Sequence, residues 1–113
     1  MTVGPAVVSR CFDQGPTPIA GAQCDRPAAL DAHVLSKRAE IAACARAGAR
    51  GRLAMVLEYR FSTQFARGWG GPASNIADPG GVSLCVKRAL FPLPLAQMPH
   101  AHDRYVVLVP FDW

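Results

Sequence analysis

The stretch GARGRLAMVLEYRFS, residues 48–62, shows the clearest hydrophobic period in the chain. Apolar side chains alternate here with mixed ones: Leu53, Met55, Leu57, Tyr59 and Phe61 form one set, and Arg52, Ala54, Val56, Glu58, Arg60 and Ser62 form the other. A period of two places the two sets on opposite faces of an extended strand. Because one set is wholly apolar and the other is charged, we predict an antiparallel strand with one buried and one solvated face. The charges on the solvated face are expected to form a ladder across neighbouring strands.

Two helices are predicted around this strand, one from about Pro27 to Ala47 and a shorter one from Pro79 to about Leu90. Apolar residues recur in both at helical spacing: Leu30, Val34, Ile41 and Ala45 in the first, and Val82, Cys85 and Val86 in the second. Proline suits the first helical position, and Asp78 suits the N-cap of the second helix.

Two further strands are predicted after residue 62. Gly68–Ala73 forms a weak strand around Trp69, and Arg104–Phe111 forms a final strand that is apolar on both faces and is therefore covered on both or central in the sheet. The economical arrangement is an α+β fold: a small antiparallel sheet of about three strands with two helices packed on one face.

Residues 1–26 are predicted to form an N-terminal arm, and residues 27–113 a single α+β domain. The arm contains one short strand, Ala6–Phe12, followed by a loop rich in glycine and proline. Cys11 and Cys24 bracket this loop. A bridge between them would close a small ring, with a stabilisation of about 3 kcal/mol, and would hold the arm in place.

The chain contains four cysteines, Cys11, Cys24, Cys44 and Cys85. The absence of a CxxC pair argues against zinc. Two disulfides in any of three pairings, or four buried thiols, are the alternatives. Disulfides would imply an oxidising compartment. The opening residues MTVGPAVVSR, however, lack the features of a secretion signal. To reconcile this with disulfides, we expect a secreted domain whose leader was removed, or one that was trimmed from a longer protein.

The formal net charge is +4, with the basic residues spread along the chain. Nucleic-acid binders usually show a clustered basic stripe, so no nucleic-acid partner is expected. No apolar run approaches the roughly 20 residues that a membrane-spanning helix needs, so no membrane span is expected.

His100, His102 and Asp103 form the only metal-like cluster in the sequence. A metal site needs a complete converging ligand set, so a solvated polar loop is the expected interpretation, with no metal, no cofactor and no catalytic residue. A small hydrolase or metal protein that uses this loop remains an alternative.

Five motifs occur in a characteristic order: Ile41-Ala42-Ala43-Cys44, Asn75-Ile76-Ala77-Asp78, Cys85-Val86, Phe91-Pro92-Leu93-Pro94 and Val109-Pro110-Phe111. Over about residues 34–113 this series resembles the AgmX/PglI C-terminal domain family, a relative of the TonB C-terminal domain found in proteobacterial envelope proteins. The resemblance implies a TonB C-terminal-like fold and a periplasmic or extracellular location. It also implies a bridge between Cys44 and Cys85, which leaves Cys11 with Cys24.

These features together predict a non-enzymatic module of the cell envelope or a secreted protein that binds another protein or peptide segment by edge-strand addition. The candidate edges lie at Trp69 and at Tyr105. The alternative is a structural subunit of a larger surface or extracellular assembly. In that case the protein would be oligomeric, and the arm and the tail ending at Trp113 would contact neighbouring subunits.

Overall fold

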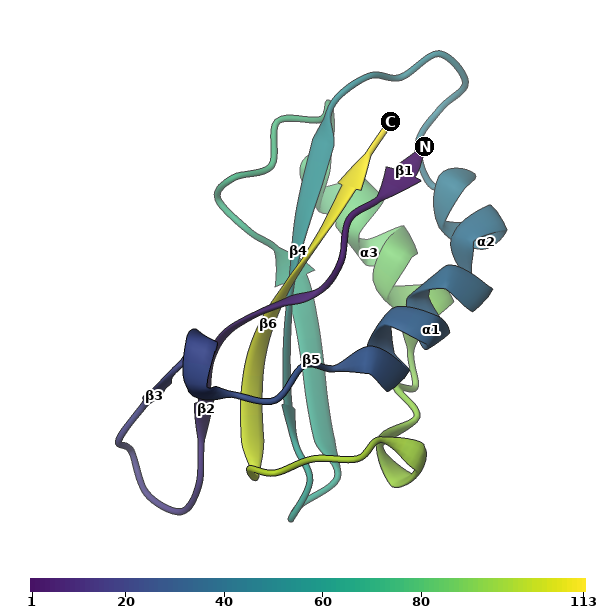
Figure 1. Cartoon of the computed structure of the whole chain (residues 1–113). Helices are drawn as coiled ribbons and strands as arrows, with labels where there is room; N and C mark the ends of the chain where they lie inside the picture. The colour runs from purple at the N-terminus through teal and green to yellow at the C-terminus, as the bar shows by residue number, and fades with distance from the viewer.

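A computed structural model describes the whole chain, residues 1–113, as a six-stranded antiparallel sheet with three α-helices on one face (Figure 1). The elements in chain order are β1 (Thr2–Val3), β2 (Val7–Phe12), β3 (Ile19–Ala20), η1 (Gly21–Gln23), α1 (Ala28–Ser36), α2 (Arg38–Ala42), β4 (Arg52–Arg60), β5 (Phe65–Gly70), α3 (Pro79–Leu90), η2 (Leu95–Gln97) and β6 (Arg104–Asp112).

The strand order in the sheet is β3-β2-β6-β4-β5, and β1 pairs with the C-terminal end of β6. The two longest strands, β4 and β6, pair along their whole length, from Arg52 opposite Asp112 to Arg60 opposite Arg104. β6 is therefore an interior strand, with β4 on one side and β1 and β2 on the other. β5 pairs only with β4 and forms one edge of the sheet.

The prediction of about three strands is wrong, because the sheet contains six. Three of the strands, β1, β2 and β3, come from the segment that we predicted as an arm. The one strand expected there, Ala6–Phe12, is confirmed as β2, but it is part of the main sheet. The alternating pattern is weak there because β2 contains an irregularity between Val8 and Arg10 that shifts its register against β6. A bulge of this kind breaks the period of two on which strand prediction depends.

The helices also differ in number from the prediction. The single helix expected over residues 27–47 is two helices, α1 and α2, which meet at Lys37. The second predicted helix is confirmed as α3, and the carboxylate of its N-cap Asp78 accepts a hydrogen bond from the backbone of Gly81.

The prediction for the organising strand is wrong for its second face, because Ala54, Val56 and Glu58 of β4 are buried as well, each 8% exposed. It is confirmed for the apolar set: Leu53, Met55, Leu57 and Tyr59 of β4, with Phe61 directly after the strand, are buried and at most 7% exposed. This face of the sheet packs against the helices, which contribute Leu30, Val34, Ile41, Val82, Val86 and Leu90 to the same core.

Both disulfides are present, and no cysteine is free. Cys11 of β2 is bonded to Cys24, and Cys44, just after α2, is bonded to Cys85 of α3. Two disulfides fit a secreted or extracellular protein. None of the helices has both the length and the apolar character that crossing a bilayer requires.

Candidate partner-binding site

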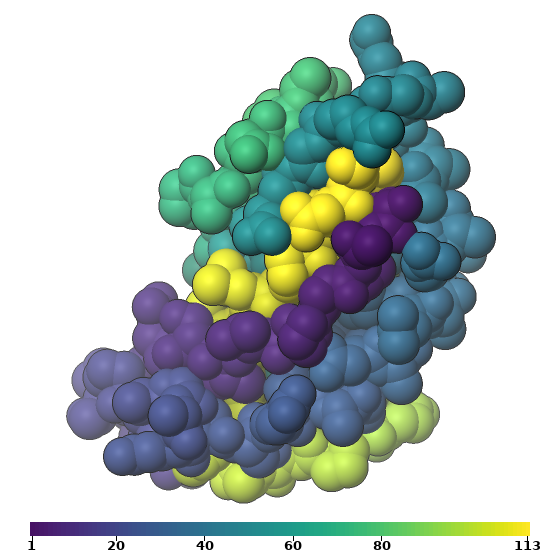
Figure 2. Space-filling view, turned by 45° about the horizontal axis from the view of Figure 1, so that its top comes forward, coloured from purple at the N-terminus to yellow at the C-terminus, as the bar shows by residue number.

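One face of the sheet carries no helix, and we call it the helix-free face. In Figure 2 the yellow atoms of β6 are visible at the surface between the purple N-terminal segment and teal atoms from the middle of the chain. Four large apolar side chains on the helix-free face are between 39% and 56% exposed: Val7, Phe65, Trp69 and Leu108. Exposed apolar side chains that gather on one face are typical of interaction surfaces.

Beneath these side chains the helix-free face has a small core of its own, formed by Phe12, Val56 and Val106. No helix covers this cluster. Instead, the guanidinium carbon of Arg104 lies 3.8 Å from the centre of the Phe12 ring. An arginine at this distance makes a favourable cation–π contact and shields the ring from water.

The helix-free face is positively charged. The strand register places five arginines on it, Arg10, Arg52, Arg60, Arg67 and Arg104, against only two acidic residues, Glu58 and Asp112. Arg52 donates a hydrogen bond to Asp112 over 2.8 Å, and this contact lowers the pKa of the Asp112 carboxyl. A cavity of about 410 Å³ on this face is lined by Glu58, Arg60, Thr63, Phe65, Arg67 and Arg104.

The backbone of β5 is free along its outer side. The amide of Gly71 donates to the carbonyl of the opposite residue Ala54 over 2.7 Å, so Gly71 and Ala54 form a hydrogen-bonded pair between the two strands. In an antiparallel pair hydrogen-bonded positions alternate, so Phe65, Arg67 and Trp69 direct their backbone groups towards β4. Ala66, Gly68 and Gly70 direct theirs outward, where no hydrogen bond within the chain reaches them.

Of the three residues predicted to bind a partner, only Trp69 lies at this edge, where it is 41% exposed. Tyr105 does not lie at the edge where we expected it, because β6 is an interior strand and Tyr105 is 2% exposed. The indole of Trp113 donates a hydrogen bond to the carbonyl of Ala42 and packs against Phe111, so it contacts its own chain.

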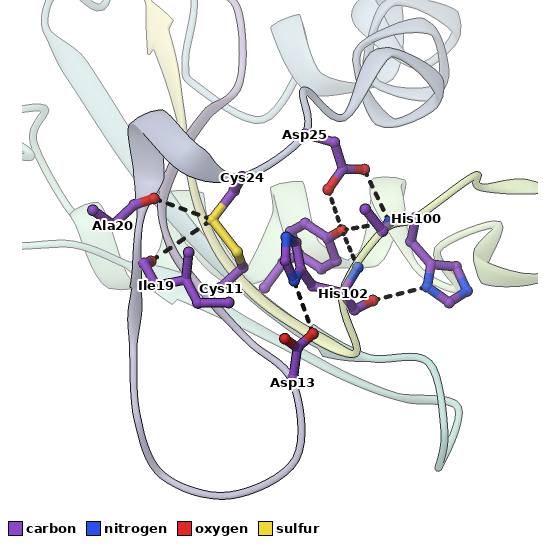
Figure 3. A network of polar contacts seen from close by, with 10 residues as sticks. Cys11, Asp13, Ile19, Ala20, Cys24, Asp25, His100 and His102 are labelled. Atoms are coloured by element: carbon purple, nitrogen blue, oxygen red, sulfur yellow. Dashed lines mark hydrogen bonds and ion pairs between the residues drawn. A yellow bond between two sulfur atoms is a disulfide. The ribbon is translucent and has the colours of Figure 1, made fainter.

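Tyr105 instead joins the N-terminal segment to the loop before β6. Figure 3 shows Asp13 and Asp25 of that segment next to this loop, which carries His100 and His102. The Tyr105 hydroxyl donates to the carboxylate of Asp25 and accepts hydrogen bonds from the amides of Ala101 and His102, over 3.1 and 3.0 Å. The Nδ1 atom of His102 lies 2.8 Å from the carboxylate of Asp13. Two acidic residues of the N-terminal segment are thus fixed to the loop.

The polar loop around His100 is likewise held by contacts within the chain. The His100 ring stacks on Phe61 at 3.6 Å between ring centres, and its Nδ1 atom lies 2.8 Å from the carbonyl of His102. A cavity of about 590 Å³ lies beside it and is lined mainly by polar residues, among them Asp13, Arg60 and Asp103. No three His, Cys, Asp or Glu side chains are arranged so that they could hold a metal ion.

The buried tyrosines Tyr105 and Tyr59 make the free energy of unfolding depend on pH under alkaline conditions. Burial, followed by the hydrogen bond to Asp25, raises the pKa of Tyr105 to about 12. Burial and the nearby Tyr105 also raise the pKa of Tyr59. A raised tyrosine pKa means that the folded state favours the neutral form of the side chain. The stability that each tyrosine contributes is therefore complete below pH 10, and it is lost as the pH rises towards the pKa of the tyrosine in the folded protein.

We therefore expect the free energy of unfolding to fall above pH 10, by at most about 1.4 kcal/mol per pH unit for each tyrosine. Urea unfolding followed by tryptophan fluorescence at pH 9, 10 and 11 measures this slope. In Tyr105→Phe the slope should decrease by the contribution of one tyrosine. An unchanged slope in this variant would show that Tyr105 ionises as easily in the folded state as in the unfolded chain.

The sequence analysis did not identify Phe65, Arg67 or Gly68, whose backbone groups point to the free edge, as part of the site. The sequence nevertheless contains a pattern that indicates this strand. Residues 65–69 read Phe-Ala-Arg-Gly-Trp, in which large and small side chains alternate with a period of two. A Cβ atom at Gly68 would lie 2.9 Å from a methyl group of Leu57, so a side chain there would displace Leu57. Small residues therefore occupy the side of β5 that faces the core, and large ones occupy the helix-free face.

The fold and this site define an α+β domain with an open sheet edge beside a positively charged, partly apolar face. Comparison with protein-family models, with curated proteins and with solved structures finds no match to this chain. The geometry of the edge is therefore the basis of the functional proposal.

Proposed function

We propose that this chain is a non-enzymatic protein-interaction module that binds an extended segment of another protein by adding it as a strand to β5. The observation that carries the proposal is the row of outward-facing, unpaired backbone groups at Ala66, Gly68 and Gly70. Unpaired edges are normally blocked by lysine, proline or a covering loop, and β5 contains neither of these residues. An added strand would satisfy these groups with main-chain hydrogen bonds.

Both sides of the edge offer contacts to the side chains of an added strand. On the helix side a cavity of about 370 Å³ lies next to Ala66 and is bounded by residues 91–97 with Gln64. On the helix-free face Phe65 and Trp69 are exposed. Successive side chains of an extended segment point to opposite faces, so alternate residues would enter the cavity and contact the aromatic rings.

The binding mode is the one expected from the resemblance to the AgmX/PglI C-terminal domain family. The disulfides are compatible with a secreted or extracellular site of action, and within that range we propose the periplasm of a bacterial envelope as the compartment.

Ala66→Pro tests the proposal, because proline removes one outward amide donor without removing a bond to β4. Proline is tolerated on edge strands when its nitrogen faces solvent. The probe is the heptapeptide Thr-Val-Thr-Glu-Thr-Val-Thr, blocked at both ends, titrated into the isotope-labelled protein. We expect amide shifts at Gly68 and Gly70, and an affinity at least about fivefold weaker in Ala66→Pro, since one hydrogen bond contributes about 1 kcal/mol.

Ala66→Ser is the matched control, because serine keeps the amide donor and should bind the peptide as the unchanged protein does. If Ala66→Pro binds as tightly as Ala66→Ser, with the same pattern of shifts, the peptide does not bind along β5 and strand addition at this edge is wrong.

A further inference from the structure

We propose that the segment bound at β5 carries an acidic residue, aspartate or glutamate, directly opposite Arg67. This inference rests on the strand addition proposed above and specifies the chemistry of the partner. The occupant is thus an extended, acidic peptide segment of another protein.

A ladder of alternating charge crosses the helix-free face and ends in a cation at the free edge. Arg104 of β6 lies 3.7 Å from one carboxylate oxygen of Glu58 on β4, and Arg67 of β5 donates to the other over 2.5 Å. Glu58 is thereby shared between two arginines and cannot neutralise both. The charges thus alternate from Arg104 on β6 through Glu58 on β4 to Arg67 on β5. A strand added beside β5 would continue this alternation if it carried a negative charge opposite Arg67.

Arg67 has hydrogen-bonding capacity left for that charge. Its side chain is 57% exposed, and only its Nε–H has a partner within the chain. A guanidinium group carries five N–H donors in a fixed planar arrangement that matches a carboxylate. The Trp69 ring lies 5.0 Å from the Arg67 guanidinium carbon and restricts its position. The terminal groups of Arg67 are therefore held, but unpaired, at the edge.

The backbone groups of Arg67 point towards β4 and not towards the free edge. Arg67 would therefore occupy the kind of position at which the side chains of β5 and of an added strand approach most closely. Ala66 and Gly68, on either side, would exchange hydrogen bonds with an antiparallel partner strand, so Arg67 would face a non-hydrogen-bonded position. Cα atoms across such a position lie about 4.5 Å apart. Partner residues two positions before and after it would face Trp69 and Phe65. The preferred segment is apolar–any–acidic–any–apolar.

A second copy of this chain fits the edge less well. β5 has the sequence FARGWG and contains no acidic residue, so a neighbouring β5 could not supply the missing charge. Pairing of two copies would also join two faces that each carry five arginines against two acidic residues. Like charges across neighbouring strands are destabilising.

The test compares two blocked heptapeptides, Thr-Val-Thr-Glu-Thr-Val-Thr and its variant with glutamine in place of glutamate. We expect the glutamate peptide to bind about two- to fivefold more tightly, as for a partly exposed cross-strand ion pair, and the difference to shrink in 1 M salt. Arg67→Gln should abolish the preference, and Arg67→Lys should keep part of it. Arg88→Gln removes one charge from an exposed position on α3 and should leave the preference unchanged.

Each other outcome has a defined meaning. Equal affinity for the two peptides, with shifts at Gly68 and Gly70, would overturn the acidic preference while strand addition stands. No shift at the edge amides with either peptide would overturn both proposals. A dimer in sedimentation equilibrium, with these amides protected, would assign the edge to a second copy. Binding of heparin at Arg60, Arg67 and Arg104 without peptide binding would assign the face to an anionic polysaccharide.

Discussion

Replacing Cys44 and Cys85 together with serine is expected to lower the free energy of unfolding by about 4 kcal/mol. The bridge joins residues that are 41 positions apart, so its loss frees a long loop in the unfolded chain. Both cysteines are only half-buried, so serine leaves little cavity. Small domains are stabilised by only 5–15 kcal/mol, and a loss of this size removes a large part of that margin.

Urea unfolding of the purified variant measures this loss. Cys11→Ser with Cys24→Ser is the comparison, because its loop spans only 13 positions and the same reasoning gives about 3 kcal/mol. The Cys11 side chain is fully buried, so its replacement adds a packing cost to that figure. A loss below 1 kcal/mol for the pair at residues 44 and 85 would mean that the reduced, unfolded chain keeps these segments together.

The Cys44–Cys85 bridge also bears on the binding edge. It connects the end of α2 to α3, and α3 packs beneath β5, where Ser83 lies close to Gly70. The position of β5 against the helices therefore depends partly on this bond. Loss of the bond should weaken peptide binding at the edge as well as stability.

The strongest local patterns in the sequence predicted their elements correctly. β4 was predictable because its two faces differ sharply in polarity over nine residues. α3 was predictable because Asp78 and Pro79 begin it with the expected chemistry. Of the three N-terminal strands, β2 was predicted as Ala6–Phe12, but its place in the main sheet was not, because that place depends on pairing with β6, which is distant in the sequence. β1 and β3 were not predictable, because each has only two residues; β1 pairs with β6 and β3 pairs with β2.

The binding site shows the same limit. The sequence predicted a weak strand around Trp69, and this strand does lie at the sheet edge, although it spans Phe65–Gly70 and not Gly68–Ala73. The contact between Arg67 and Glu58 depends on the register between β4 and β5, which no local pattern specifies. The apolar character of both faces of β6 already favoured a central position, and it should have outweighed the exposed edge that we expected at Tyr105.

The helix-free face is open only if nothing covers it in solution, and a matched pair of leucine substitutions tests this. Leu57 on β4 is fully buried against the helices, whereas Leu108 on β6 lies on the helix-free face and is 39% exposed. The two residues occupy the two central paired strands of one sheet. They differ mainly in the face on which they lie.

Leu57→Ala is expected to lower the free energy of unfolding by about 3 kcal/mol, because it removes buried methyl groups and leaves a cavity in the main core. Leu108→Ala should cost less than about 1 kcal/mol, because a partly exposed side chain loses little burial. Urea unfolding of both variants at two protein concentrations gives the comparison. If Leu108→Ala costs as much as Leu57→Ala, and the cost depends on protein concentration, then copies of the chain bury the helix-free face against one another. The face would not then be free to accompany a bound strand, and the proposed role of Arg67 would have to be abandoned.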